Sequence, residues 1–187
     1  FLTRECSVKP SGSVVKPFDI RAYCRTLDKN TAVIGYANSD RGELLILVAT
    51  DRGVAGKKID IGPPLRNLFL AFRDQVDAAE RDLSRESLTL ADTAATIDAN
   101  KKSNIERAVT LYRYFLKNPA RCRSEKGSVT VSQRVGRALS RFLVDPVLDP
   151  LGARTRLLIL PDGALGFLPF EALVGPDGRY LAEKFEI

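Results

Sequence analysis

Histidine, methionine and tryptophan are absent from the 187 residues, and cysteine occurs only three times. Serine and cysteine hydrolases of the usual kind use an imidazole to take and return a proton, and most zinc sites include an imidazole ligand. Neither kind of site can be completed from these residues alone. The chain begins at Phe1 instead of a methionine, so we expect a processed or excised piece of a longer protein.

The three cysteines, Cys6, Cys24 and Cys122, are irregularly spaced, which fits neither a disulfide framework nor a zinc cluster. We therefore expect a reducing, cytoplasmic environment and no cofactor. No apolar run approaches the roughly 20 residues that cross a bilayer, and the N-terminus lacks the apolar core of a signal peptide. The sequence predicts a soluble protein without a membrane partner.

Basic residues are concentrated in one stretch. From Lys101 to Arg141 there are eleven lysines and arginines and only two acids. Such a segment could attract phosphates or acidic partners, but exposed helix faces are the commoner place for these residues. No aromatic residues alternate with Arg134, Arg137 and Arg141, which argues against nucleic acid as the partner. We expect these three arginines to face solvent.

The first half of the chain reads as a linker followed by a small sheet. Residues 1–20 mix Ser, Gly, Lys and Pro and predict a linker. Three short runs rich in Val, Ile and Leu then predict strands at 31–37, 43–49 and 54–61. The Asp and Gly residues between these runs suit tight turns, so we expect an antiparallel meander.

Helical spacing replaces strand spacing after the meander. Apolar residues on one face predict a helix over 64–83, whereas the weak pattern of 84–100 leaves a loop or a poorly packed helix open. Ser103 with Glu106, and Thr130 with Gln133, match the capping box that opens a helix. We expect one helix to begin at each pair.

A run of apolar residues at 156–160 predicts a strand buried on both faces, and a helix leading into such a strand is typical of an α/β layered unit. The chain continues as Pro161-Asp162-Gly163-Ala164-Leu165-Gly166-Phe167-Leu168-Pro169-Phe170-Glu171-Ala172-Leu173, then Gly178-Arg179-Tyr180-Leu181 and Lys184-Phe185-Glu186-Ile187. This pattern resembles the CHAT domain, the caspase-like module associated with tetratricopeptide repeats.

The resemblance implies a mixed α/β fold, in which a meander and helices lead into the first strands of a caspase-like sheet. It divides the chain into a scaffold at 21–150 and the start of the caspase-like core at 151–187. It also implies a cysteine endopeptidase with upstream helical repeats, whose catalytic His and Cys lie downstream of the strand beginning near Phe185. No catalytic residue is therefore expected in this chain. For the motif residues we expect structural roles: Pro161, Asp162, Gly163, Leu168, Pro169, Phe170, Glu171, Leu173 and Tyr180.

Few residues remain as candidates for chemistry. The cations that flank Cys122 would favour a thiolate, but the chain has no histidine to serve it. Cys24 reads as a small packing residue. Asp162 and Glu171 could recognise a basic substrate side chain, although a turn residue and a solvated glutamate are the simpler interpretation.

Two hypotheses remain open. The chain is either the scaffold part of a cysteine endopeptidase that acts on a protein substrate, or a non-catalytic module that binds a protein regulator.

Overall fold

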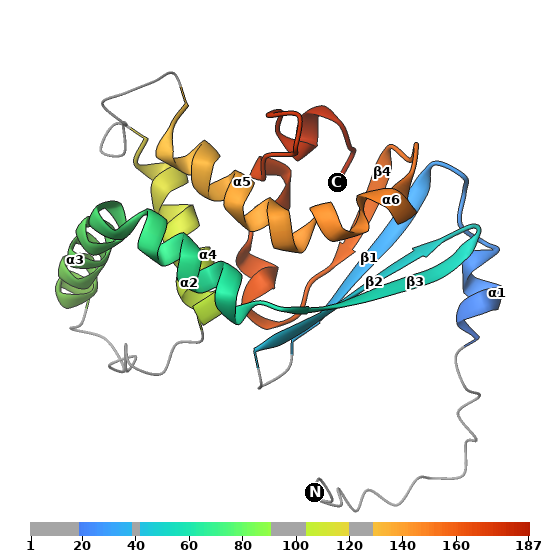
Figure 1. Cartoon of the computed structure of the whole chain (residues 1–187), viewed down its shortest axis with the longest axis horizontal. Helices are drawn as coiled ribbons and strands as arrows, with labels where there is room; N and C mark the ends of the chain where they lie inside the picture. Colours follow the sequence, from blue (N-terminus) through green and yellow to red (C-terminus); the bar gives the residue numbers. More distant parts are fainter. Residues whose placement is uncertain (1–18, 39–41, 91–103, 120–128) are drawn as a thin grey trace, which may run out of the picture.

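The computed structural model describes residues 19–38, 42–90, 104–119 and 129–187, and the side chains of 86–90 are not among them. The fold is mixed α/β, as expected. A four-stranded sheet has the order β3-β2-β1-β4, and its strands are β1 (Thr31–Asn38), β2 (Glu43–Thr50), β3 (Gly53–Asp60) and β4 (Arg156–Leu160). Strands β1 to β3 form the predicted antiparallel meander, and β4 runs parallel to β1 (Figure 1).

Helices lie against the sheet, and all of them except α1 belong to one side of it. They are α1 (Ile20–Cys24), α2 (Gly62–Ala71), α3 (Arg73–Leu90), α4 (Asn104–Lys117), α5 (Val131–Leu143) and α6 (Leu148–Leu151). Residues 1–18 of the predicted linker and 91–100 of the undecided segment lie outside the described residues. The part of that segment up to Leu90 is helical. None of the helices in the described ranges is long and apolar enough to span a membrane.

The predicted single helix at 64–83 is wrong in one respect, because the backbone leaves helical geometry at Phe72, with φ −121° and ψ 29°. The amide of Phe72 still donates to the carbonyl of Leu68 at 3.2 Å, and Val76 donates to the carbonyl of Phe72 at 2.8 Å. Since these bonds keep the helical spacing of buried residues across the break, the hydrophobic period gives no sign of it.

Helix α5 begins with the predicted capping box. The amide of Gln133 donates to Thr130 Oγ1 at 3.2 Å, and the amide of Thr130 donates to Gln133 Oε1 at 2.9 Å. These bonds satisfy donors that the first turn of a helix leaves free. For the other predicted box, Ser103 lies outside the described residues, while Glu106 lies in the first turn of α4.

The expectation that the three arginines of α5 all face solvent is wrong for Arg137. Its two terminal nitrogens donate to the two carboxylate oxygens of Asp145 at 3.0 and 2.7 Å, and both side chains are three-quarters buried. Arg134 and Arg141 are exposed as expected. Asp145 lies just beyond the end of α5, so spacing along the helix alone could not identify this pair.

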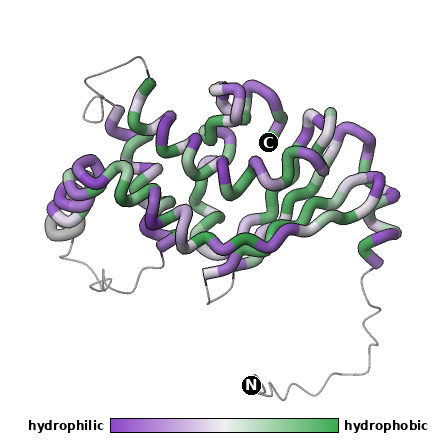
Figure 2. Tube along the Cα trace, in the orientation of Figure 1, coloured by the Kyte–Doolittle hydropathy of each residue, from purple (hydrophilic) through white to green (hydrophobic). Residues whose placement is uncertain are grey.

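A hydrophobic core fills the space between the helices and one face of the sheet. Residues with even numbers in β1 and β2 point into it, and residues of α2 to α5 and of 165–185 meet them there. Figure 2 shows apolar residues along the central strands and inner helices, whereas α3 is mostly hydrophilic. One hydrophobic core therefore contains residues from both predicted parts of the chain, 21–150 and 151–187. The division into these two parts stays a prediction.

The opposite face of the sheet is covered at one end only. There Cys24 of α1, 2% exposed, packs on Val33 and Ala49, in agreement with a packing role for this cysteine. Elsewhere Leu45, Leu47, Leu158 and Leu160 are between 39% and 60% exposed.

The expected burial of β4 on both faces is wrong for this part of the chain. Leu157 is 1% exposed and points into the core, whereas its neighbour Leu158 is 48% exposed. The reason is that no described element covers the second face beside β4.

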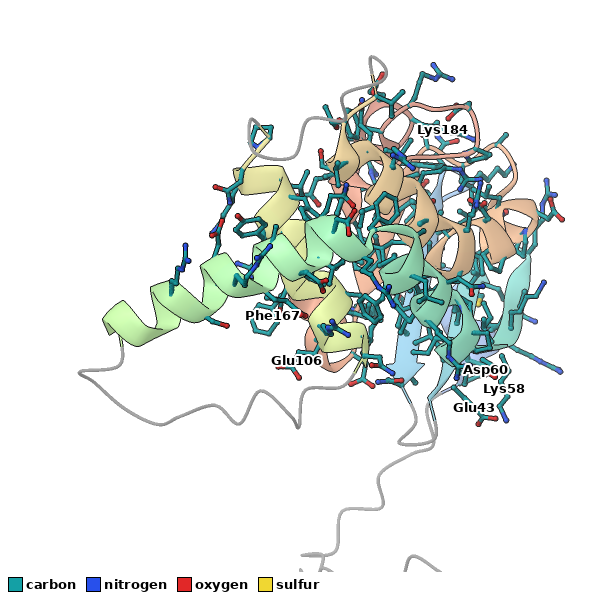
Figure 3. The ribbon with its side chains drawn as sticks, turned by 60° about the vertical axis from the view of Figure 1, so that its left-hand side comes forward. Glu43, Lys58, Asp60, Glu106, Phe167 and Lys184 are labelled. Atoms are coloured by element: carbon teal, nitrogen blue, oxygen red, sulfur yellow. The ribbon has the colours of Figure 1, made fainter. Side chains whose placement is uncertain are left out.

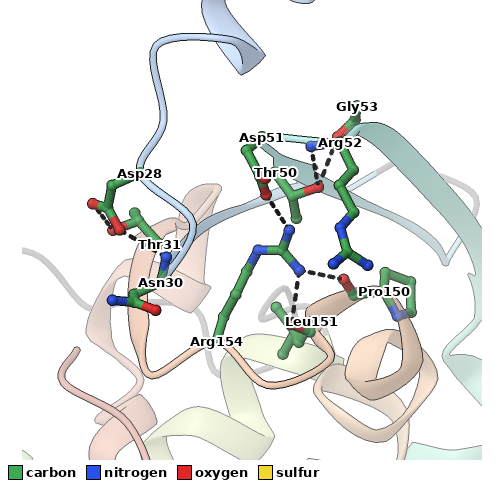
Figure 4. A network of polar contacts seen from close by, with 10 residues as sticks. All are labelled: Asp28, Asn30, Thr31, Thr50, Asp51, Arg52, Gly53, Pro150, Leu151 and Arg154. Atoms are coloured by element: carbon green, nitrogen blue, oxygen red, sulfur yellow. Dashed lines mark hydrogen bonds and ion pairs between the residues drawn. The ribbon is translucent and has the colours of Figure 1, made fainter.

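Arg154 links the approach to β4 with the turn between β2 and β3 (Figure 4). Its guanidinium donates to the carboxylate of Asp51 and, at 3.1 Å, to the carbonyl of Leu151. The hydrogen bond from Arg154 is the main cause that lowers the pKa of Asp51. Because Arg154 is only 8% exposed, this ion pair fixes the start of β4 against the meander.

Candidate functional site beyond strand β4

The carboxyl ends of the two parallel strands are joined by the first motif residues. The amide of Asn38, the last residue of β1, donates to Asp162 Oδ2 at 2.9 Å. Gly163 follows with φ +52°, a conformation that favours glycine, and opens a short 3-10 helix, Gly163–Phe167. Ligands of open α/β sheets bind outside the carboxyl ends of such strands. Asp162 and Gly163 therefore shape this edge of the sheet.

The next motif residues anchor the segment in the core. Leu168, Phe170 and Leu173 are buried. The ring of Phe170 lies 5.3 Å from the ring of Tyr36, measured between centroids, and the Tyr36 hydroxyl donates to the carbonyl of Leu143 at 3.0 Å. Burial raises the pKa of Tyr36, so its hydroxyl stays a neutral donor. This tyrosine fixes the motif segment to the end of α5.

A second buried tyrosine holds the segment from the other side. The hydroxyl of Tyr112 in α4 donates to the carbonyl of Ala172, and the side chain is fully buried. Burial raises the pKa of Tyr112, and the nearby Tyr180 and Glu171 raise it further. Helix α5 comes so close that a Cβ atom on Gly136 would lie 2.7 Å from the Tyr112 hydroxyl.

A small hairpin follows at 174–180. Val174 and Tyr180 form an antiparallel bridge, and the amide of Gly175 donates to the carbonyl of Arg179 at 2.8 Å. Gly178, with φ +81°, makes the turn. The amide of the half-buried Tyr180 donates to Glu183 Oε1 at 2.9 Å. These bonds fix the shape of the hairpin, whose residues Val174 and Pro176 line a groove together with residues of α5.

After the hairpin the chain returns to the free edge of β4. The amide of Glu186 donates to the carbonyl of Thr155, and the amide of Leu157 donates to the carbonyl of Glu186, both at 2.8 Å. This is a parallel bridge between Arg156 and Glu186, strengthened by an ion pair of 3.0 Å between their side chains. The bridge occupies the position at which the sequence predicts a further strand.

The acidic candidates stay at the surface. Asp162 and Glu171 are both exposed, and so are Pro161 and Phe167, while Pro169 is half-buried. Figure 3 places Phe167 on the outside, where Arg113 lies 5.8 Å from the centre of its ring. At the lower right of Figure 3, Glu43 and Lys58 form a cross-strand ion pair of 2.7 Å at the surface.

Within the described ranges, 19–38, 42–90, 104–119 and 129–187, no cysteine lies in the segment after β4. Within these ranges no group of three or more His, Cys, Asp or Glu could hold a metal ion. Cys24 is buried on the opposite face of the sheet, and Cys122 lies outside the described residues. What the arrangement does is position the ends of β1 and β4 and the start of a neighbouring strand.

Sequence reasoning missed the residues that hold the motif in place, Tyr36, Tyr112 and Gly136. An isolated glycine inside a helical pattern is a known sign of close approach by another group, and Gly136 gave that signal. The two tyrosines gave none, because apolar spacing identifies a buried ring but not the acceptor of its hydroxyl.

A comparison with known families covers this part of the chain. Residues 133–187 match the family model of the CHAT domain, a span that starts inside α5 and contains β4, the motif and the hairpin. The resemblance found in the sequence is confirmed for this segment, and it suggests a caspase-like family member. No curated protein matches the chain.

Proposed function

We propose that this chain is the front part of a CHAT-type, caspase-like cysteine endopeptidase, and that it forms the scaffold on which the catalytic segment assembles. The observation that carries the proposal is the parallel bridge between Arg156 and Glu186, which lies inside the segment matched by the CHAT domain. The bridge starts the pairing of a further strand with the free edge of β4, so the sheet is built to grow in that direction.

The uncovered face of the sheet supports the same proposal. Parallel strands of α/β folds usually have helices on both faces, and β4 pairs in parallel with β1. Leu158 and Leu160 are 48% and 60% exposed on the face that no described helix covers beside β4. Further helices of the α/β core would bury these leucines. The meander and helices of 21–150 then serve as the scaffold, and 151–187 begins the core.

The residue types present in the chain limit which catalytic groups of a cysteine endopeptidase it could supply. A cysteine endopeptidase needs a thiolate, an imidazole that protonates the leaving amine, and donors for the oxyanion. The chain has no histidine. We therefore place the catalytic His and Cys in the segment after Ile187, at the carboxyl ends of later strands beside the edge that Asp162 marks. The partners would be a protein substrate and upstream helical repeats.

Complementation tests the proposal. The chain alone should hydrolyse no peptide from a panel with basic, acidic or small residues before the scissile bond. Adding the downstream segment in trans should restore cleavage, and Glu186→Pro should abolish that rescue because it removes the amide that bonds to Thr155. Glu186→Ala is the control, because it keeps the amide and loses only an exposed ion pair with Arg156. Turnover by the chain alone that disappears in Cys122→Ala would overturn the proposal.

A second candidate function is that of a non-catalytic module that binds a protein. A groove lined by residues of α2, α5 and the hairpin at 174–180, described below, favours it. The residues that follow Ile187 distinguish the two. A histidine and a later cysteine, each after an apolar strand, identify the peptidase, and their absence identifies the module.

A further inference from the structure

A groove of about 970 Å³ runs between α2, α5 and the hairpin at 174–180, away from the ends of the parallel strands. Leu68, Phe72 and Phe142 line its floor, and Val174 with Pro176 forms the wall on the hairpin side. Its size is in the range of sites that bind small ligands or short peptide segments. We call it the α2–α5 groove.

The charge of this groove has one sign. Its lining, taken from the described residues, contains Arg134, Arg137 and Arg141 and no acidic residue. Arg137 is neutralised by its two hydrogen bonds to Asp145. Within the described part of the chain, Arg134 and Arg141 make no ion pair, and Arg134 only lies over the ring of Phe72, 5.1 Å from its centre. Two cations therefore remain available to a ligand.

The spacing of these cations restricts the ligand. Arg134 and Arg141 are seven residues apart on α5, which places their backbones about 10 Å apart along the helix. On an extended peptide in the polyproline II conformation, which has three residues per turn, two acidic residues three positions apart point to the same side and are separated by about 9 Å. The apolar floor between the arginines would then receive an apolar side chain of the same peptide.

We propose that the α2–α5 groove docks an extended segment of a protein partner that carries two acidic residues about three positions apart, with an apolar residue between them. The acids bind Arg134 and Arg141, and the apolar residue lies over Leu68 and Phe142. The hairpin forms one wall, so the CHAT motif shapes this groove as well as the sheet edge. The proposal holds whether or not the whole protein is a peptidase.

A peptide fits this groove better than a nucleic acid does. Binding of single strands relies on aromatic rings that stack with bases. The aromatic residues of the lining, Phe72 and Phe142, are only 6% and 4% exposed, and Arg134 already lies over the ring of Phe72. Their rings contribute carbon atoms to the floor and no open face for a base.

The test begins with a phage-displayed library of random octapeptides, selected on the purified chain. A fluorescein-labelled synthetic copy of an enriched peptide is then titrated and followed by anisotropy. The variant Arg134→Gln/Arg141→Gln removes the two proposed contacts. The matched control, Arg66→Gln/Arg73→Gln, removes two exposed charges from α2 and α3 that do not line the groove. Thermal unfolding of each variant confirms that it is folded.

We expect enriched peptides to carry paired acids about three residues apart, and we expect at least about tenfold weaker binding to the groove variant, as the loss of charge-assisted hydrogen bonds predicts. The control should stay within about twofold, since surface charges away from a site have small effects. A peptide with lysines in place of the acids should bind Arg134→Glu/Arg141→Glu instead. That exchange would separate direct contact from a general loss of folding.

Three results would overturn the proposal. The first is a selection without acidic peptides. The second is equal loss of binding in the groove variant and in the control. The third is binding of a labelled oligothymidylate that needs both arginines while no peptide does, which would assign the groove to nucleic acid.

Discussion

Replacing Gly136 by alanine should destabilise the protein, although the same change inside an ordinary helix stabilises it. The new Cβ atom would lie 2.7 Å from the Tyr112 hydroxyl and 3.2 Å from the ring carbon that bears it. Tyr112 is fully buried and its hydroxyl donates to the carbonyl of Ala172, so the ring has no free direction in which to move.

The expected change in the free energy of unfolding combines one stabilising contribution and two destabilising ones. Alanine gains about 1 kcal/mol over glycine in a helix interior. Overpacking of a buried site costs about 1–3 kcal/mol, and displacing the hydroxyl from the Ala172 carbonyl costs about 1 kcal/mol more. The net expectation is a loss of about 1–3 kcal/mol in the free energy of unfolding, measured by urea denaturation with an unchanged slope.

Two further variants make this measurement specific. Tyr112→Phe removes the hydroxyl nearest to the new methyl group, so Gly136→Ala should cost less in that background, and the difference is the coupling energy of the pair. Gly166→Ala is the matched control, because a Cβ there meets nothing within 4 Å. If Gly136→Ala raised stability, or cost the same with and without the hydroxyl, the close approach described here would be refuted.

Three other predictions concern charge, exposed leucines and acid. Arg137→Gln leaves the three-quarters buried side chain of Asp145 without its cationic partner and should cost about 1–2 kcal/mol in urea denaturation, and an unchanged midpoint would contradict the ion pair. Leu158→Lys/Leu160→Lys should reduce the binding of a hydrophobic dye and self-association with little change in melting temperature, and an unchanged dye signal would contradict the exposed face. The pKa of Asp51 is lowered in the folded state, so its contribution to stability is present above the unfolded pKa of about 3.9 and is lost as pH falls below it. Asp51→Asn should therefore weaken the acid dependence of unfolding, and parallel curves for both proteins would contradict this.

Local signals in the sequence predicted the meander and the start of α5 well. Each strand of the meander begins and ends within about a residue of the expected positions, because turns and alternating side chains are decided by neighbours along the chain. The Thr130 and Gln133 capping box is equally local. The CHAT motif could also be recognised from its residues, and the family match confirms it over 133–187.

The wrong predictions share one physical cause. The periodicity of apolar residues along the chain indicates which residues share a face, but it does not indicate which other elements cover that face. The run at 156–160 is apolar throughout, yet what covers Leu158 depends on elements that the run itself does not specify. The same limit explains Arg137, whose partner Asp145 lies past the end of the helix, and the break at Phe72, which leaves the spacing of buried residues intact.

The site depends on this kind of long-range information more than the fold does. Asp162 reaches back 124 positions to the amide of Asn38, and the hydroxyl of Tyr112 reaches forward 60 positions to Ala172. Each bond ties the segment after β4 to an element formed much earlier in the chain, and Glu186 then pairs with the outer edge of β4 itself. Since these bonds fix the residues beside the outer edge of β4, the described part of the chain positions the start of a further strand.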